Sequence, residues 1–354
     1  MVSLFQKQCI MAKQIIKQSV GFDVSKDNIS VCFSQEETGK KFRIVSSRTF
    51  SSTASGFRQM DAWVRRHANE GTALHLLMEA TGVYYEELAY FLREKGYRVA
   101  VLLPNKAKAF AKSLNYKSKT DKIDAKVLAQ MCLERDLEEW QPASEQWLKI
   151  KRLCRERAEL LAEKTAVSNR LHAKEHSHQP DAQSLKRAKT LLKFLKKQIK
   201  EVEQAIENAV EADVQVKQKV DNVCTIKGVG VITAASVIAE TNGFALFKNK
   251  AQLVSYAGYD LVENQSGSSL NGKTRISKKG NSHIRRCLHF PALVAIKHNI
   301  RFKNLYDRVF ENTKIKMKGA VAVQRKLLVL IYTLYRKNQP FDPEYNPKKL
   351  IAFV

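Results

Sequence analysis

The sequence predicts an α/β plus α protein: a mixed sheet with helices, a long helical arm of coiled-coil type, and a mainly helical C-terminal domain. Three observations lead to this class. Strand-like alternation opens the chain and passes into strand–helix–strand–helix spacing before residue 142. Residues 145–223 then contain one Pro and no Gly. The remainder has helical spacing around one polar loop, 264–281. The predicted domains are an N-terminal extension (1–18) and the regions 19–142, 143–221 and 222–354.

The elements of the first region follow from apolar spacing. Alternation around Asp23 predicts two strands joined by a tight turn near residues 26–28. The short apolar runs ALHLLM and RVAVLL predict buried strands, because they are bounded by polar or breaking residues. The further elements are a strand at 41–50 and helices at 56–68, 84–95 and 121–133.

The helical arm is strongly basic. Between Lys149 and Lys200 there are 15 basic and 5 acidic residues. Two long helices are predicted, broken near 176–180, as a helical hairpin or coiled coil. A solvated spacer is the alternative, but an apolar stripe in an isolated arm needs a partner, which favours a homo-oligomer, a dimer or tetramer. The stripe consists of Leu185, Leu192, Leu195, Ile199, Val202 and Ile206.

The composition narrows the class of protein. The 354 residues carry 61 Lys and Arg against 35 Asp and Glu, a net charge of +26. This excess favours a nucleic-acid partner over mere solubility. No apolar run is long enough for a transmembrane helix, so no membrane partner is expected. The N-terminus lacks a secretory signal, and six scattered Cys without a CxxC pair predict a reducing cytoplasm.

Four carboxylates stand out in this basic chain. Asp23 lies within an apolar strand, Glu79 ends another, and Asp121 and Asp124 share one helix face. Singly, each is better explained as a turn residue, strand end or helix-start acid. Jointly they match the RNase H-like arrangement, in which carboxylates hold two Mg²⁺ ions about 4 Å apart, with Mn²⁺ as a substitute. Lysines that would hold phosphate surround the helical pair: Lys106, Lys108, Lys112, Lys117, Lys119, Lys122 and Lys126.

The polar loop contains the pattern of a nucleotide-binding P-loop, GSSLNGKT at 267–274. A P-loop must follow a buried strand and open a helix, and neither is predicted here. The segment from Asn264 to Tyr306 contains nine Lys and Arg and no Asp or Glu. The loop is therefore interpreted as a phosphate contact. Ser266, Ser268 and Ser269 are candidate nucleophiles, although a loop hydrogen-bonding role is the default for each.

A glycine-containing turn precedes an Ala-rich apolar helix in VCTIKGVGVITAASVIAE, residues 223–240. The pattern is typical of a helix-hairpin-helix element, where Gly228 and Gly230 would let backbone amides approach a phosphate. A tight packing turn is the alternative.

Two sets of motifs carry a family resemblance. GFDVSK, MEATGVYYEELAYFL and KTDKIDAKVLAQ resemble the N-terminal domain of the DEDD transposases of bacterial insertion sequences, family one-ten. IKGVGVITAASVIAE, LVSYAGYD and QSGSSLNGKTRISKKGNSHIRRCL resemble that family's C-terminal domain. The likeness covers about residues 19–133 and 222–300, in the same order as in the family.

The resemblance implies a site and a set of partners. Asp23, Glu79, Asp121 and Asp124 match the metal-binding tetrad of a RuvC-like domain, and Ser266 matches the catalytic serine. The resemblance also implies a serine–phosphate intermediate. It implies a homo-oligomer whose composite site joins one subunit's acids to another's serine. It further implies an element-encoded RNA that pairs with donor and target DNA. A cytoplasmic location at the bacterial nucleoid follows. Expected nucleic-acid contacts are Lys117, Lys119, Lys122, Gly228, Gly230, Lys273, Arg275, Lys278, Lys279, Arg285 and Arg286.

The sequence therefore predicts a site-specific DNA transposase or recombinase. The first alternative is a RuvC-like, structure-selective endonuclease that uses water as its nucleophile. The second is a non-catalytic nucleic-acid-binding protein or RNA chaperone, whose function would survive loss of Asp23 and Glu79.

Overall fold

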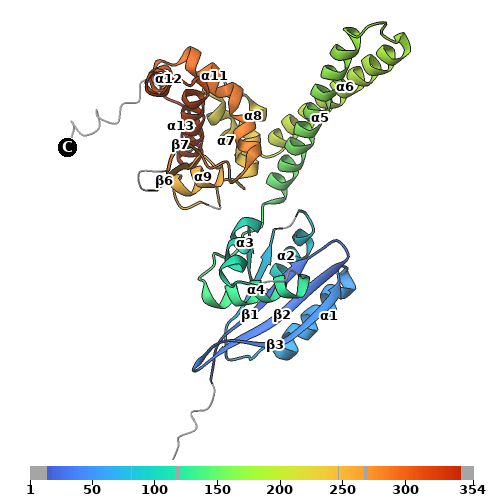
Figure 1. The fold of residues 1–354 in the computed structure, drawn as a ribbon, viewed down its shortest axis with the longest axis vertical. Helices are drawn as coiled ribbons and strands as arrows, with labels where there is room; N and C mark the ends of the chain where they lie inside the picture. The colour runs from blue at the N-terminus through green and yellow to red at the C-terminus, as the bar shows by residue number, and fades with distance from the viewer. Residues whose placement is uncertain (1–13, 81, 117–119, 246, 267–269, 344–354) are drawn as a thin grey trace, which may run out of the picture. The chain divides into compact units, whose positions relative to one another are not determined.

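The computed structural model describes residues 14–80, 82–116, 120–245, 247–266 and 270–343 (Figure 1). The chain divides into two compact units, Met1–Pro142 and Ala143–Val354. Each unit has its own hydrophobic core.

A five-stranded sheet forms the centre of the first unit, in the order β3-β2-β1-β4-β5. β2 runs antiparallel to β1 and β3, whereas β1, β4 and β5 are parallel. This order and these directions are those of the RNase H/RuvC-like fold, so the predicted fold class is confirmed. The strands are β1 (Ile15–Val24), β2 (Asn28–Glu37), β3 (Lys40–Ser51), β4 (Leu74–Glu79) and β5 (Arg98–Leu102).

Helices cover both faces of this sheet. Phe22, Met78 and Val99 face α1 (Ala54–His67) and α2 (Tyr85–Glu94), and form one core with them. The alternate residues Leu77 and Ala100 pack with α3 (Pro104–Ser113) and α4 (Asp121–Glu134) in a second core. The three parallel strands are buried on both faces, which explains their continuous apolar runs.

Helix α3 was not predicted, because Pro104 was interpreted as the end of the preceding strand. The proline does end β5, but it also occupies the first turn of α3. A proline fits there because the first helical N–H groups have no partner within the helix. Pro104 therefore marks both the end of β5 and the start of α3, and only the end of the strand was predicted.

Helix α4 lies directly on β1. The Ser19 hydroxyl donates a hydrogen bond to the Ala129 carbonyl (2.8 Å). A Cβ atom on Gly21 would stand 2.2 Å from the Ala125 carbonyl oxygen and 2.3 Å from the Ala129 nitrogen. The absence of a side chain at Gly21 is what allows helix and strand to approach so closely.

Gly21→Ala is expected to lower the free energy of unfolding of the first unit by about 3 kcal/mol, since the new methyl meets backbone atoms that cannot rotate away. Thermal or urea unfolding of the full chain measures this. Gly71→Ala is the control, because its nearest contact would be the Asn69 side chain at 3.4 Å. Equal stability of the two variants would contradict the close packing of α4 on β1.

The second unit is mainly helical, as predicted. Its helices are α5 (Glu145–Glu175), α6 (Ala182–Glu211), α7 (Val214–Cys224), α8 (Val231–Glu240), α9 (Lys250–Tyr256), α10 (Ser282–Cys287), α11 (His289–His298), α12 (Ile300–Thr313) and α13 (Lys316–Lys337). The two long helices of the arm are confirmed, but the second ends at Glu211. A separate α7 follows, because the Asp213 side chain accepts hydrogen bonds from the amides of Gln215 and Val216 and so starts a new helix.

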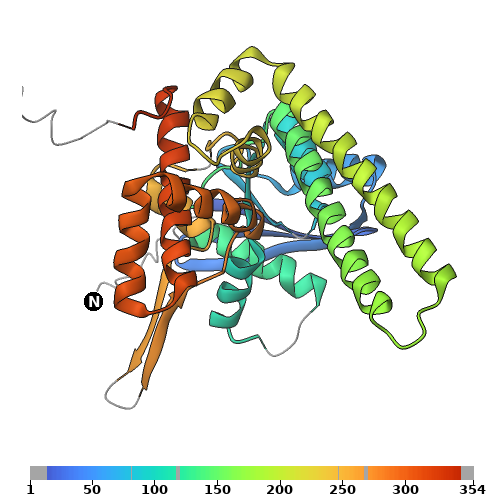
Figure 2. The ribbon, with the colours of Figure 1, turned by 90° about the horizontal axis from the view of Figure 1, so that it is seen from above.

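The arm is a hairpin in which α5 packs along α6, the adjacent long pair in Figures 1 and 2. The predicted stripe is buried at Leu195, Ile199, Val202 and Ile206. The partner that this stripe requires is therefore α5 of the same chain. The predicted oligomer must use another surface, and it stays a prediction. The second helix also exposes two apolar side chains away from the stripe, Leu191 and Phe194.

The predicted polar loop at 264–281 is in fact largely an antiparallel hairpin, β6 (Leu261–Ser266) and β7 (Leu270–Ile276). We call these two strands the serine hairpin. The hairpin extends away from the helices of its unit in Figure 2. Four of the six residues of β6 and five of the seven of β7 are consecutive and polar or Gly, so neither strand has an apolar periodicity that would distinguish it from a loop.

The hairpin excludes the P-loop interpretation. Gly272 pairs with Asn264 within the sheet, and the strand continues through Thr274 to Ile276. A P-loop would open a helix at that position. Across the described residues, no helix combines the length and the apolar character needed to cross a bilayer.

Candidate functional site

Asp23 and Glu79 lie at corresponding positions on neighbouring parallel strands. Phe22 of β1 pairs with Met78 of β4, so the next step of the register sets Asp23 beside Glu79. Paired residues of parallel strands point to the same face of a sheet. Leu77, two residues before Glu79, faces α4, and Gly21, two residues before Asp23, touches α4. Both carboxylates therefore belong to the face that α4 covers.

The contacts between α4 and β1 extend this register to the helical pair. Lys17 donates to the carbonyl of Leu133 (3.4 Å), Ser19 to that of Ala129, and Gly21 lies against Ala125. Two residues along a strand and four residues along a helix each cover about 6 Å, so the contacts between β1 and α4 repeat at this interval. The next step along β1 is Asp23, and the next along α4 is its first turn, with Asp121 and Asp124.

The four acids differ in exposure. Asp23, Glu79 and Asp124 are half-buried, whereas Asp121 is exposed at the helix start. The Thr120 hydroxyl accepts a hydrogen bond from the Ile123 amide and fixes where α4 begins. Among the residues that the structure describes, no three His, Cys, Asp or Glu side chains come close enough together to hold a metal ion. The fold thus brings the backbone positions of the acids to one end of the sheet without closing their side chains into a finished ligand set.

Lysines flank this end of the sheet. Lys122 is exposed on the first turn of α4, and Lys126 lies one turn further on, with its ammonium 5.2 Å from the centre of the Tyr116 ring. Lys117 and Lys119, two of the predicted nucleic-acid contacts, fall outside the described residues. Lys122 can therefore meet phosphate at the start of α4, whereas Lys126 is half-buried and already contacts an aromatic ring.

The serine hairpin positions the predicted nucleophile. Ser266 is the last residue of β6 and pairs with Leu270 of β7. The alternatives Ser268 and Ser269 lie outside the described residues. Lys273 and Arg275 lie on β7, and Lys278 and Lys279 are exposed just beyond it. In this register Ser266 lies at the opposite end of the hairpin from Lys278 and Lys279, whose exposed side chains suit phosphate recognition.

Two further predicted contacts, Arg285 and Arg286, lie on α10 and differ in their surroundings. Arg286 is exposed. The Arg285 guanidinium donates to the carbonyls of Ala257 (2.8 Å), Asn281 (3.3 Å) and Lys278 (3.3 Å). Arg285 therefore holds the loop that follows β7, and a direct contact to nucleic acid stays a prediction for both arginines.

The predicted helix-hairpin-helix element consists of α7, a glycine turn and α8. Gly228 has φ of +97°, and a Cβ there would stand 2.7 Å from Val294 of α11. This residue therefore serves close packing as well as the turn. Gly230 starts α8 with no side-chain cap and has open space around it. Its position leaves the first amides of α8 uncovered by any cap, which suits a phosphate contact.

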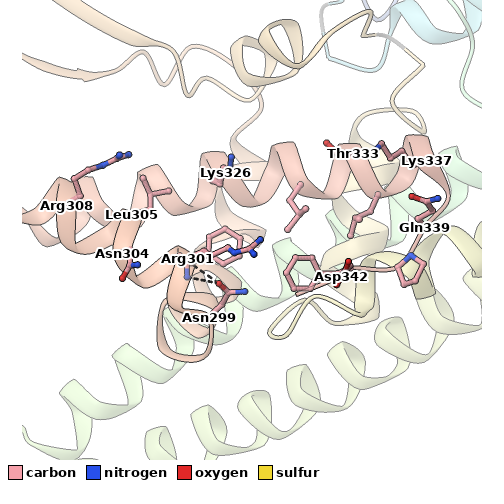
Figure 3. Close-up of a pocket in the computed structure, with 15 residues that line it drawn as sticks. Asn299, Arg301, Asn304, Leu305, Arg308, Lys326, Thr333, Lys337, Gln339 and Asp342 are labelled. Atoms are coloured by element: carbon pink, nitrogen blue, oxygen red, sulfur yellow. Dashed lines mark hydrogen bonds between the residues drawn. The ribbon is translucent and has the colours of Figure 1, made fainter. Parts of the chain in front are cut away.

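A groove of about 940 Å³ lies between α12 and α13 (Figure 3). Apolar side chains such as Leu305 and Leu330 line it, together with the cations Arg308 and Lys326. None of the predicted site residues belongs to it. No sequence pattern predicts this groove, because its lining combines surface residues of two helices with the segment 339–342 that follows α13.

A five-stranded sheet in RNase H order, with carboxylates from β1, β4 and α4 at one end, defines a class: an enzyme of the RNase H-like group that acts on nucleic-acid strands. Two family models narrow this class. A DEDD transposase model of the IS110 type matches residues 20–174, and the model "Transposase IS116/IS110/IS902 family" matches residues 220–307. The chain belongs to the IS110 family of transposases, and DNA is its substrate.

Relatives of known name agree with the family. The chain is 27% identical over 331 residues to "Pilin gene-inverting protein" of Moraxella bovis, covering 92% of this chain and 98% of the relative. The protein of the same name from Moraxella lacunata matches equally. A solved structure of T. thermophilus RuvC with a Holliday junction substrate aligns over 32% of this chain and 90% of that chain, at 12% identity and a TM-score of 0.25. The fold assignment rests on the strand order described above.

The family implies a divalent metal ion. The four acids offer only oxygen donors, which hard divalent ions prefer, so the donor chemistry fits. Asp23, Glu79, Asp121 and Asp124 are the residues that would hold the ion, and half-buried carboxylates gain from a cation that offsets their partial desolvation.

Proposed function

We propose that this transposase cuts and rejoins DNA strands through a covalent bond between Ser266 and a DNA phosphate. The backbone register that brings Asp23, Glu79 and the first turn of α4 to one end of the sheet is the observation that carries the metal site. The serine hairpin, with its acid-free and cation-rich flank, supports the nucleophile.

The proposed step is a transesterification. The Ser266 oxygen gives up its proton and forms a bond to phosphorus, and the bond from phosphorus to the 3′ oxygen breaks. That oxygen takes up a proton and leaves as a 3′-hydroxyl. The reverse step on a partner strand restores the serine, so no bond energy is lost. Divalent ions at the acids, Mg²⁺ or Mn²⁺, would polarise the phosphate and offset the charge of the transition state.

The residues around the hairpin bind and orient the strand in this proposal. Exposed Lys278, Lys279 and Arg275 lie toward the base of the hairpin and would hold phosphates farther along the DNA strand from the one attacked. The uncapped start of α8 at Gly230 offers a further phosphate contact. The composite site implied by the family, with acids of one subunit and the serine of another, requires a homo-oligomer.

The assay for this function is direct. Purified protein, its co-purified RNA, donor and target DNA and Mg²⁺ are mixed, denatured with detergent and separated. A protein–DNA adduct that survives denaturation supports the covalent step. Hydrolysed ends without an adduct would favour the alternative, an endonuclease that uses water.

We also propose that a structured, element-encoded RNA guides the choice of site. The positive charge lies in separate regions, around α4, along the arm and after Asn264, which suits a protein that holds DNA and a large RNA together. Base pairing would then select sequence, while the protein contacts backbone and shape. The relatives named as gene-inverting proteins support recombination between defined sites.

A discrete RNA from the region flanking the gene is expected to co-purify with the protein at low salt and to dissociate as salt rises, because phosphate contacts release counterions. Sequencing of the bound RNA checks this. A recombination assay with and without that RNA follows. Co-purification of random cellular RNA, or recombination that does not depend on the added RNA, would contradict guidance.

A further inference from the structure

The serine hairpin is held at its base by a short loop, residues 277–281. The Ser277 amide donates to the Asp260 carbonyl (2.7 Å), and the Lys278 amide donates to the Gly258 carbonyl (3.1 Å). These two bonds join the first two residues after β7 to the short segment just before β6. The direction in which the hairpin leaves its unit therefore depends on where this loop is fixed.

Asn281 fixes the end of that loop. Its amide donates to the Tyr256 carbonyl (2.7 Å), and its side-chain oxygen accepts from the amides of His283 (2.9 Å) and Ile284 (3.2 Å) at the start of α10. The remaining donor, the Asn281 side-chain NH₂, reaches Oε2 of Glu240 at 2.7 Å. One residue, through its backbone amide and its side chain, thus joins α9, α10 and the end of α8.

Glu240 is the buried centre of this arrangement. Only 3% of the residue is exposed, and its carboxylate is met on the other side by Arg155 of α5, with Nε at 2.7 Å and Nη2 at 3.0 Å. Burial alone would raise the pKa of Glu240, but the hydrogen bonds from Arg155 and Asn281 hold that pKa below its usual value. The group is therefore a carboxylate at neutral pH, and the two-bond pair with Arg155 is of the strong, directional kind.

We propose that Glu240 is a positioning residue for the serine: its carboxylate joins α5, at the base of the arm, through Asn281 to the loop that holds the serine hairpin. This inference rests on the proposed role of Ser266. A buried carboxylate with partners on two sides has one low-energy arrangement, because any other leaves a charge unpaired. The arm and the hairpin are thereby held in one relation within the second unit.

Asn281→Asp tests the link without removing the helix cap. The new carboxylate still accepts from the α10 amides, but it presents an oxygen instead of a donor to Glu240. The matched control is Asn249→Asp, because Asn249 caps α9 by accepting from the Gln252 amide, and no hydrogen bond joins its side chain to a carboxylate of the described residues. Glu240→Gln added to Asn281→Asp supplies the rescue, since the introduced amide can donate to the introduced carboxylate.

The rate of covalent adduct formation at saturating DNA is expected to fall about 100-fold in Asn281→Asp, because misplacement of a nucleophile by about 1 Å has that effect. DNA affinity should stay close to that of the unmodified protein. The melting temperature should fall in Asn281→Asp, because two carboxylates then face each other at a buried site, and it should recover in the double variant. The double variant should recover most of the rate. Hydrogen exchange of the described hairpin amides, measured on the same proteins, should accelerate in Asn281→Asp and not in Asn249→Asp.

Each outcome decides the proposal. Unchanged adduct rate and unchanged exchange in Asn281→Asp would overturn it. Equal losses in Asn281→Asp and Asn249→Asp, with no rescue by the double variant, would reduce the link to a structural contact. If the unmodified protein forms no adduct, the proposed serine chemistry fails, and the exchange comparison alone then decides whether Glu240 holds the hairpin.

Discussion

Ser266→Ala is expected to abolish the covalent protein–DNA adduct and to reduce strand exchange by more than about 10³-fold, since loss of a covalent nucleophile removes the whole pathway. DNA binding should be unchanged, because the cations of the hairpin remain. Adduct yield on denaturing gels and filter binding measure the two quantities on one preparation.

Ser268→Ala and Ser269→Ala are the matched controls, because they remove the same hydroxyl within three residues of Ser266. Both should still form the adduct. Loss of the adduct in one of them, with Ser266→Ala active, would move the nucleophile to that serine. An adduct in all three variants would end the serine proposal.

Asp23→Asn is expected to slow strand cleavage by at least about 10²-fold, because a neutral amide cannot offset the charge of a divalent ion that would stabilise the transition state. The fold should be kept, since the replacement is isosteric. Rates at saturating DNA, titrated with Mg²⁺ and then with Mn²⁺, measure the effect. Chelation of divalent ions from the unmodified protein should produce the same loss.

Asp27→Asn is the control for charge, because Asp27 is exposed in the turn between β1 and β2, close in sequence to Asp23. It should retain full activity. If Asp23→Asn and Glu79→Gln also cleaved DNA at the full rate, the acids would be structural. If the unmodified protein cleaved no DNA, and both variants bound nucleic acid as it does, the protein would be a non-catalytic nucleic-acid-binding protein.

Much of the first unit could be predicted, because its strands are short apolar runs with clear limits. Gly21 shows where prediction ended. The strand around it could be predicted. The need for glycine could not, because a Cβ on Gly21 would lie 2.2 Å from the Ala125 carbonyl oxygen of α4, more than 100 residues away. Pro104 shows a second limit, since a proline that ends one element can begin the next.

The second unit was harder to predict at its polar segments. The serine hairpin was expected to be a loop, because its unbroken runs of polar residues carry no apolar periodicity. The stripe on α6 was correctly found, but its partner was assigned to another chain when α5 supplies it. Pairing between two helices of one hairpin cannot be distinguished from pairing between chains by periodicity alone.

The candidate acids could be proposed from sequence because each interrupts an apolar segment in a basic chain. Glu240 likewise ends the apolar segment VITAASVIAE, but no role was predicted for it. Its partners, Arg155 and Asn281, lie 85 and 41 residues away. Such a link becomes visible only when the tertiary structure brings three helices together.

Mass spectrometry of the trapped protein–DNA adduct identifies the residue that is joined to DNA. After digestion with a nuclease and a protease, we expect a nucleotide joined by its 5′ phosphate to Ser266, dependent on divalent metal and absent from Asp23→Asn. A nucleotide on another residue, or cleaved DNA with free ends and no modified peptide, would contradict it.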